Sequence, residues 1–190
     1  MSKKNIYTNK KIRFNKLSKK FKDNNYIIYI KNIFPEEIFE KIVDITDNFK
    51  DSVKPDKFTK SRFGTFVPKE SELYQIIYNE KTKSIFEKIV KQKLDIGDFP
   101  IEYRIYDNES NGMIWHKDVT LYSKPQYEFV YVIKNSSKSK TAFANKNKVK
   151  YLKTEPNSLI IVRANGAPHK VTPNKVGDRH ILKFILPVKN

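Results

Sequence analysis

The half of the chain after Phe99 constrains the fold most, because it breaks into short apolar segments separated by turns. These segments are rich in β-branched and aromatic residues, which favour strands. A series of short strands at regular spacing is typical of a β-sandwich or barrel. We predict strands over residues 100–106, 113–118, 127–134, 141–144, 148–152, 158–163, 168–173 and 179–187.

The preceding half has a mixed pattern that predicts one strand and a supporting helix. The run Tyr-Ile-Ile-Tyr-Ile at residues 26–30 favours a strand. Pro35 suits the first position of a helix, and the apolar residues between Ile38 and Phe49 recur at helical spacing. Residues 51–70 have neither a helical nor a strand period, so we predict a loop there.

Two further helices are expected between that loop and Phe99. Ser71 is suited to cap the first of them. Ser84 is followed three residues later by Glu87, which predicts a capping box at the start of the second helix. Gly97 is expected to end that helix.

The charge of the chain is strongly positive, with 38 Lys and Arg residues against 21 Asp and Glu and a formal net charge of +17. Such a charge attracts nucleic acid, acidic proteins or an anionic surface. However, 33 of the basic residues are Lys and five are Arg, a usage that genome composition explains equally well, since phosphate recognition draws on Arg. Residues 1–25 carry scattered lysines and little apolar periodicity, which predicts a flexible basic arm.

The absence of cysteine excludes disulfides, thiolate metal sites and cysteine nucleophiles. A metal ion would therefore have to be held by His, Asp or Glu. The first residues lack the apolar core of a signal peptide, and no later run is long enough to span a bilayer. We expect a soluble, intracellular, cytoplasmic protein of one domain.

Two candidate metal ligands lie in the segment Met-Ile-Trp-His-Lys-Asp at residues 113–118. Alternate side chains of a strand share a face, so His116 and Asp118 are expected to point the same way. A third ligand must come from elsewhere, and the other histidines are His169 and His180. Two imidazoles and one carboxylate on one face of a metal ion suit a non-haem Fe(II) oxygenase, which needs open positions for a cosubstrate and O₂.

The pattern His-x-Asp at 116–118, a distal histidine at His169 and a basic residue, Arg179, ten positions later resembles the 2-oxoglutarate- and Fe(II)-dependent dioxygenases, and within them the prolyl 4-hydroxylase-like group. The resemblance covers about residues 99–187. It implies an α+β fold with a double-stranded β-helix, or jelly roll, and supporting N-terminal helices. One domain would then span residues 26–190, with the support at 26–98 and the core at 99–187.

The resemblance also implies roles for individual residues. His116, Asp118 and His169 match the iron ligands of the family and form the catalytic centre. Arg179 matches the basic residue that binds the distal carboxylate of 2-oxoglutarate, a role that suits a guanidinium fork. Tyr131 and Tyr106 match two tyrosines that contact the cosubstrate in the hydroxylases.

Other residues leave alternatives open. Lys183 shares a strand face with Arg179, so it is an alternative or additional partner of the carboxylate. Arg62 and Arg104 are candidates to contact the substrate. Ile185 stands where protein hydroxylases often carry a tryptophan, which is a departure from the prolyl group. Trp115 is expected on the face opposite His116, as a packing residue.

Two more sequence features complete the expectations about the site. His180, which follows Arg179, is expected to face away from the cavity in a structural role. Asn165-Gly166, between two predicted strands, indicates a two-residue hairpin that would carry His169 to the mouth of the barrel.

The activity implied by the resemblance is hydroxylation of a protein side chain such as peptidyl proline, with 2-oxoglutarate and O₂ converted to succinate and CO₂. Fe(II) would be the metal cofactor, and a protein or peptide would be the partner. One alternative is oxidation of a nucleic-acid base or a small molecule by the same chemistry. Another is a jelly-roll binding module without turnover.

Overall fold

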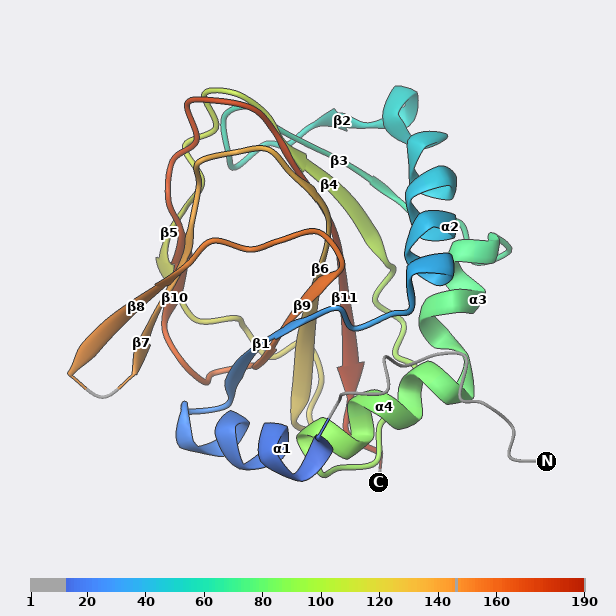
Figure 1. Cartoon of the computed structure of the whole chain (residues 1–190), viewed down its shortest axis with the longest axis vertical. Coiled ribbons are helices and arrows are strands. Elements are labelled where there is room, and N and C mark those ends of the chain that lie inside the picture. The colour runs from blue at the N-terminus through green and yellow to red at the C-terminus, as the bar shows by residue number, and fades with distance from the viewer. Residues whose placement is uncertain (1–12, 146, 190) are drawn as a thin grey trace.

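The computed structural model describes residues 13–145 and 147–189 (Figure 1). The helices are α1 (Phe14–Asp23), α2 (Glu36–Asp47), the 3₁₀ turn η1 (Lys50–Ser52), α3 (Glu72–Tyr78) and α4 (Glu80–Val90). The strands are β1 (Ile27–Lys31), β2 (Lys54–Pro55), β3 (Arg62–Phe66), β4 (Glu102–Tyr106), β5 (Met113–His116), β6 (Gln126–Asn135), β7 (Thr141–Asn145), β8 (Lys148–Leu152), β9 (Ser158–Arg163), β10 (His169–Val171) and β11 (Arg179–Pro187).

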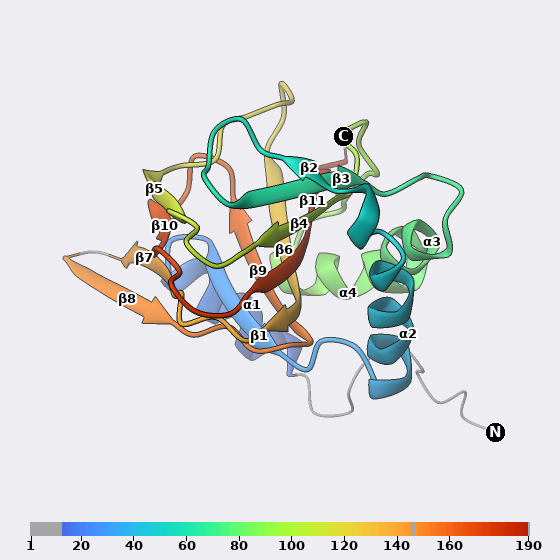
Figure 2. The same cartoon turned by 90° about the horizontal axis from the view of Figure 1, so that it is seen from above.

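These strands form two antiparallel sheets. The larger sheet has the order β1-β9-β6-β11-β4-β3-β2, and the smaller has the order β5-β10-β7-β8. Figures 1 and 2 show α2, α3 and α4 on one side of the larger sheet and the smaller sheet on its other side. The larger sheet is therefore the middle layer, and its central strands β9, β6 and β11 are buried on both faces.

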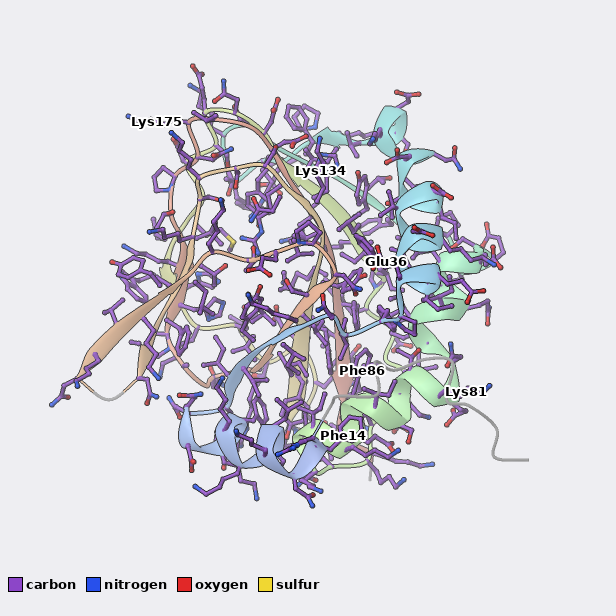
Figure 3. The ribbon with its side chains drawn as sticks, in the orientation of Figure 1. Phe14, Glu36, Lys81, Phe86, Lys134 and Lys175 are labelled. Atoms are coloured by element: carbon purple, nitrogen blue, oxygen red, sulfur yellow. The ribbon has the colours of Figure 1, made fainter. Side chains whose placement is uncertain are left out.

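The main hydrophobic core lies between the helices and the larger sheet. On β11 the side chain of Phe184 points toward the helices, where its ring stacks on Phe129 of β6 with the ring centres 5.0 Å apart. Phe86 of α4, labelled in Figure 3, completes this group, with its ring centre 4.6 Å from that of Phe129. Since alternate side chains point to opposite faces, the residues between these core positions point toward the smaller sheet.

The strand predictions for the second half of the chain are confirmed, since each of the eight predicted segments overlaps one strand of β4 to β11. The loop predicted over residues 51–70 is wrong in part, because it contains β2 and β3. Gly64 interrupts the sequence pattern by which β3 could have been predicted, because glycine is rare in strands. Pairing with β4 stabilises β3 in the structure.

The predicted capping box at Ser84 is wrong, since α4 begins one turn earlier. Its cap is Asn79, whose side-chain oxygen accepts a hydrogen bond of 2.8 Å from the backbone N–H of Thr82. The helix ends at Lys91, which adopts a left-handed conformation with φ 58°, and not at Gly97. Asn at the first cap is as effective as Ser, so the sequence offered two starts and tertiary packing selected the earlier one.

The segment predicted as a flexible arm is helical where the structure describes it. α1 buries Phe21, whose ring packs against Tyr26 at 5.7 Å and Tyr127 at 5.9 Å between the ring centres. Its lysines lie on the outer side of an amphipathic helix. Because lysines outnumber the apolar residues in this segment, the helical period was not recognised in the sequence. Residues 1–12 lie outside the described residues.

The turn at Asn165-Gly166 exists, but it does not form a hairpin. Asn165 has φ 56°, and the backbone N–H of Gly166 donates to the carbonyl of Arg163 at 2.9 Å. β9 pairs with β1 and β6, whereas β10 pairs with β5 and β7. The turn therefore carries the chain from the larger sheet to the smaller one.

Candidate metal centre and cosubstrate cavity

A cavity lies between the two sheets and is lined by both. The smaller sheet contributes His116, His169 and Thr141, and the larger sheet contributes residues of β4, β6, β9 and β11 that point away from the helices. The lining residues are Ile27, Arg104, Tyr106, Met113, His116, Asp118, Glu128, Val130, Thr141, Ile160, Val162, His169, Val171, Arg179, Ile181 and Lys183.

The predicted ligands His116, Asp118 and His169 come together in this cavity. Their ligand atoms all lie within 4.8 Å of one another. His116 of β5 stands opposite His169 of β10 in the sheet register, and their ring centres are 4.3 Å apart. Asp118 follows β5, and its backbone carbonyl accepts a 3.0 Å hydrogen bond from the N–H of Asn165 in the turn between the sheets.

The imidazoles of His116 and His169 both turn Nε2 toward Asp118. Nδ1 of His116 lies 2.8 Å from the carbonyl of Ile114, and Nδ1 of His169 lies 3.1 Å from the carbonyl of Ala167. A backbone carbonyl only accepts, so each Nδ1 carries the proton and each Nε2 presents a lone pair. These Nε2 atoms lie 3.7 and 3.5 Å from the carboxylate oxygens of Asp118.

The electrostatics of the group favour a cation. Burial lowers the pKa of His169 to about 4, so its imidazole is neutral near pH 7. Burial raises the pKa of Asp118, and the positive charge of Lys183 opposes this rise. Oδ2 of Asp118 is buried without a hydrogen-bond partner among the described residues. A buried carboxylate oxygen facing two imidazole lone pairs is a donor set that fits a divalent first-row metal.

Arg179 lies in the same cavity and is 2% exposed. Its Nη1 donates a 3.3 Å hydrogen bond to the hydroxyl of Thr141, and its guanidinium carbon lies 6.0 Å from the ring centre of Tyr106. Its Nε is buried without a partner in the described part of the chain. Burial lowers the pKa of Arg179, yet guanidinium stays protonated in proteins, so this site needs an anion.

Lys183 also faces the cavity, but an acidic residue already neutralises it. Its Nζ forms a 2.9 Å ion pair with Glu128 of β6, which is 4% exposed. Burial raises the pKa of Glu128, and the charge of Lys183 opposes this rise. Sequence reasoning missed Glu128, although a Glu in the apolar run of β6 is a signal of a buried polar partner.

The remaining predicted contact residues divide into two groups. Tyr106 and Arg104 line the cavity, and Arg104 forms an ion pair with Glu102. Arg62 does not line it; its Nη2 forms a 2.8 Å ion pair with Asp56, and its guanidinium carbon lies 5.7 Å from the ring centre of Tyr106.

The prediction that Tyr131 contacts the cosubstrate is wrong. Its side chain points into the helix-side core, where its ring packs on Phe34 at 5.3 Å between centres and its hydroxyl donates to Asn157 at 3.2 Å. Strand alternation explains this position, because the neighbouring Val130 of β6 points into the cavity.

His180 faces away from the cavity, as predicted. Its Nε2 donates to Asp178 at 2.9 Å, and its Nδ1 accepts from the hydroxyl of Tyr103 at 2.7 Å. Trp115 lies on the opposite face from His116, also as predicted, but it is 41% exposed and not a core residue. No helix within residues 13–145 and 147–189 is long and apolar enough to cross a membrane.

Comparisons of sequence find nothing: no family model matches the chain, and no curated protein matches it. Solved structures do match. An oxidoreductase of the 2OG-Fe(II) oxygenase family from Burkholderia pseudomallei superposes with a TM-score of 0.75 at 7% identity, covering 96% of this chain and 93% of the other. A Trichoplax adhaerens prolyl hydroxylase, in complex with a peptide of hypoxia inducible factor, gives a TM-score of 0.74 at 12% identity, with 92% and 88% covered.

A third match, HygX from Streptomyces hygroscopicus, was solved with nickel, 2-oxoglutarate and hygromycin B bound. Its TM-score is 0.69 at 8% identity, and the match covers 90% of this chain and 86% of HygX. Identities this low establish the fold alone. The chain has the fold of the 2-oxoglutarate- and Fe(II)-dependent oxygenases, and it brings a His-Asp-His group together inside that fold.

Proposed function

We propose that this protein is an Fe(II)- and 2-oxoglutarate-dependent dioxygenase. The observation that carries the proposal is one cavity that holds a three-residue metal donor set on the smaller sheet and an unneutralised Arg179 on the larger sheet. We further propose that the two sheets are the halves of a double-stranded β-helix, and that residues 26–190 act as one domain.

His116, Asp118 and His169 would hold the metal. The orphaned Oδ2 of Asp118 and the two Nε2 lone pairs supply three donors from one side, which leaves positions for other ligands. When bound, Fe(II) supplies the redox chemistry that activates O₂ with 2-oxoglutarate and yields succinate, CO₂ and an oxidised substrate. The backbone carbonyls of Ile114 and Ala167 orient the two imidazoles for this task.

Arg179 would bind the distal carboxylate of 2-oxoglutarate. Its free Nε and its Nη1 can both donate to a carboxylate, and the hydroxyl of Thr141 lies beside them. The ring of Tyr106 lies next to the guanidinium of Arg179. Lys183 is the alternative partner of this carboxylate, but its charge is already neutralised by the ion pair with Glu128. Arg179 is therefore the better-supported anchor.

The substrate we propose is a protein side chain, such as peptidyl proline. Support comes from the similarity to a prolyl hydroxylase solved with a peptide. Oxidation of a small molecule is a second candidate, because HygX, a match of comparable coverage, holds hygromycin B. Arg104, at the wall of the cavity, is the residue we expect to contact either substrate.

The test is an anaerobic titration of the purified protein with Fe(II) and 2-oxoglutarate, followed by exposure to O₂ and quantification of succinate. We expect succinate from the wild-type protein, even slowly and without substrate, and none above background from Asp118→Ala. Peptide and small-molecule pools added to the same assay would then separate the two substrate classes by which pool accelerates succinate formation.

One control variant and two contrary outcomes make this result decisive. His180→Gln removes a histidine that faces away from the cavity and should keep iron-dependent turnover. A wild-type protein that binds neither Fe(II) nor 2-oxoglutarate would refute the oxygenase proposal and leave a binding module as the better account. A protein that binds iron but never consumes 2-oxoglutarate would also favour a binding module.

A further inference from the structure

The outer face of the smaller sheet carries exposed aromatic rings and apolar side chains. Trp115 of β5 is 41% exposed, and Tyr151 and Val149 of β8 are 54% and 47% exposed. Figure 2 shows β5, β10, β7 and β8 at the side of the molecule away from α2, α3 and α4. These exposed side chains distinguish this face from the central strands of the larger sheet, which are buried on both faces.

Strand alternation fixes which residues belong to this face. His169 and Val171 of β10 line the cavity, so Lys170 between them points outward. The Nζ of Lys170 lies 5.0 Å from the ring centre of Trp115, which places that ring on the outer face too.

Strand alternation also places Tyr151 on this outer face, on the side of Lys170 away from Trp115. Thr141 of β7 lines the cavity, so the next residue, Ala142, points outward, although its small side chain is itself buried. Its partner in the register of β8 is Tyr151. Ala142 also pairs with Lys170. The order across the sheet is therefore Trp115, Lys170, Ala142, Tyr151, with the two rings about 14 Å apart over three strand spacings.

The charge of this face is positive and without compensation. Lys140 directly precedes β7 and Lys153 directly follows β8, and both are exposed. If the alternation continues by one residue beyond each strand, both lie at the end of the outer face that carries Lys170. None of these three lysines forms an ion pair with another described residue. Residues 129–154 and 156–177, which supply β7, β8 and β10, contain no Asp or Glu.

We propose that this face, defined by Trp115, Tyr151, Lys140, Lys153 and Lys170, binds single-stranded nucleic acid. Rings that lie open on a sheet can stack on bases, and the lysines between and beside them can pair with phosphates. This surface lies on the side of the sheet opposite the metal-ligand cavity, so its binding does not depend on the proposed oxygenase activity.

An anionic membrane is the competing partner, and the arrangement of the residues disfavours it. A membrane surface would favour a continuous apolar patch with lysines at its margin. Here Lys170 lies on the ring of Trp115 and separates it from Tyr151, so charges and rings alternate. Alternation of rings and cations matches a strand in which bases and phosphates alternate.

The test uses Trp115 as its probe, because it is the only tryptophan of the chain. Titration of the full-length protein with a single-stranded DNA of about 12 nucleotides should quench its fluorescence as a base stacks on the ring. Anisotropy of the labelled DNA gives the affinity. With three lysine contacts, raising NaCl fourfold should weaken binding roughly 20-fold.

Matched variants separate this face from general charge attraction. Tyr151→Ala and Lys170→Gln should each weaken binding about tenfold, whereas Tyr151→Phe, which keeps the ring, should retain it. The controls Phe66→Ala and Lys69→Gln, an exposed ring and an exposed lysine elsewhere, should bind as the wild type does. Circular dichroism of each variant verifies the fold.

Three outcomes would overturn the proposal. One is DNA binding that leaves the fluorescence of Trp115 unchanged. Another is an equal loss of affinity in Lys69→Gln and Lys170→Gln, which would indicate diffuse attraction by the net charge. The third is a fluorescence response to phosphatidylserine vesicles without a response to DNA, which would assign the face to a membrane surface.

Discussion

Arg179 and Lys183 lie on the same face of β11, yet their electrostatic surroundings differ. Lys183 is neutralised by Glu128 at 2.9 Å, whereas the described residues offer Arg179 only the hydroxyl of Thr141. If Arg179 anchors 2-oxoglutarate, Arg179→Gln should weaken its binding by about 30- to 150-fold, the equivalent of a lost charge-assisted pair. Isothermal titration of the Mn(II)-loaded protein with 2-oxoglutarate measures this change.

The comparison variant for that titration is Lys183→Gln, which should change the affinity for 2-oxoglutarate by less than about fivefold. Both variants remove one positive charge from the same strand face, so a general field effect would weaken binding equally in the two. Equal losses would show that Arg179 has no special role. A larger loss in Lys183→Gln would restore Lys183 as the anchor.

The grouping of His116, Asp118 and His169 could be predicted from the sequence, but the residues that line the cavity around them could be predicted only in part. His116 and Asp118 are separated by one residue, a local relation that strand alternation makes readable. Tyr131 was misplaced because one position of register moves a side chain to the opposite face of the sheet. Glu128 was missed because its role depends on Lys183, a residue 55 positions away (183 − 128) on a neighbouring strand.

A charged turn connects β6 to β11 through hydrogen bonds. Asp178, directly before β11, accepts hydrogen bonds from Lys134 at 2.8 Å, from the hydroxyl of Ser136 at 2.6 Å and from His180 at 2.9 Å. Burial alone would raise the pKa of Asp178, but these donors hold it well below its usual range. A lowered folded-state pKa stabilises the protein above the unfolded value of about 4, and this stabilisation is lost as pH falls through the folded-state pKa.

We therefore expect Asp178→Asn to lower the free energy of unfolding by about 1 to 2 kcal/mol at pH 7, since it removes the charged acceptor of this turn. The melting temperature should fall by about 3 to 6 °C. The difference from wild type should persist from pH 7 to pH 5 and shrink below about pH 4, where the carboxylate of the unfolded wild-type chain takes up its proton while that of the folded protein stays ionised. Thermal unfolding across this pH range would refute the assignment if the difference grew on acidification.

The packing of α1 against the core depends on Phe21. Phe21 is fully buried between Tyr26 and Tyr127, so Phe21→Ala should cost about 3 to 5 kcal/mol of stability and lower the melting temperature by about 10 °C. Phe58→Ala removes a ring that is 91% exposed and should change stability by less than about 0.5 kcal/mol. Similar melting temperatures for the two variants would mean that α1 does not contribute to the core.

Only some of the helix and strand boundaries could be predicted from the sequence. The strands of the second half were readable because each is a short apolar run with turn residues on both sides. β3 was not, because its stability comes from pairing with β4, a neighbour that lies far along the chain. The start of α4 was misread because both Asn79 and Ser84 are competent caps, and only packing of the helix on the sheet decides between them.

The proposed sites for the metal and for the cosubstrate lie on different sheets. His116 and His169 belong to the smaller sheet, and Arg179 belongs to the larger one. A metal ion alone would contact only the smaller sheet. A metal together with 2-oxoglutarate would connect the two, because the cosubstrate would reach from the metal to the guanidinium. The sheets should therefore be stabilised against separation only when both ligands are present.

We therefore expect a cooperative thermal shift. Mn(II), which resists oxidation in air, should raise the melting temperature slightly, and 2-oxoglutarate alone should not raise it. Both together, each at about 100 times its dissociation constant, should add more than the sum of the separate shifts, with a gain of about 5 °C or more. In Arg179→Gln the shift with both ligands should fall to that of the metal alone, because the link to the larger sheet is missing. A strictly additive response in the wild-type protein would mean that the two ligands bind without connecting the sheets.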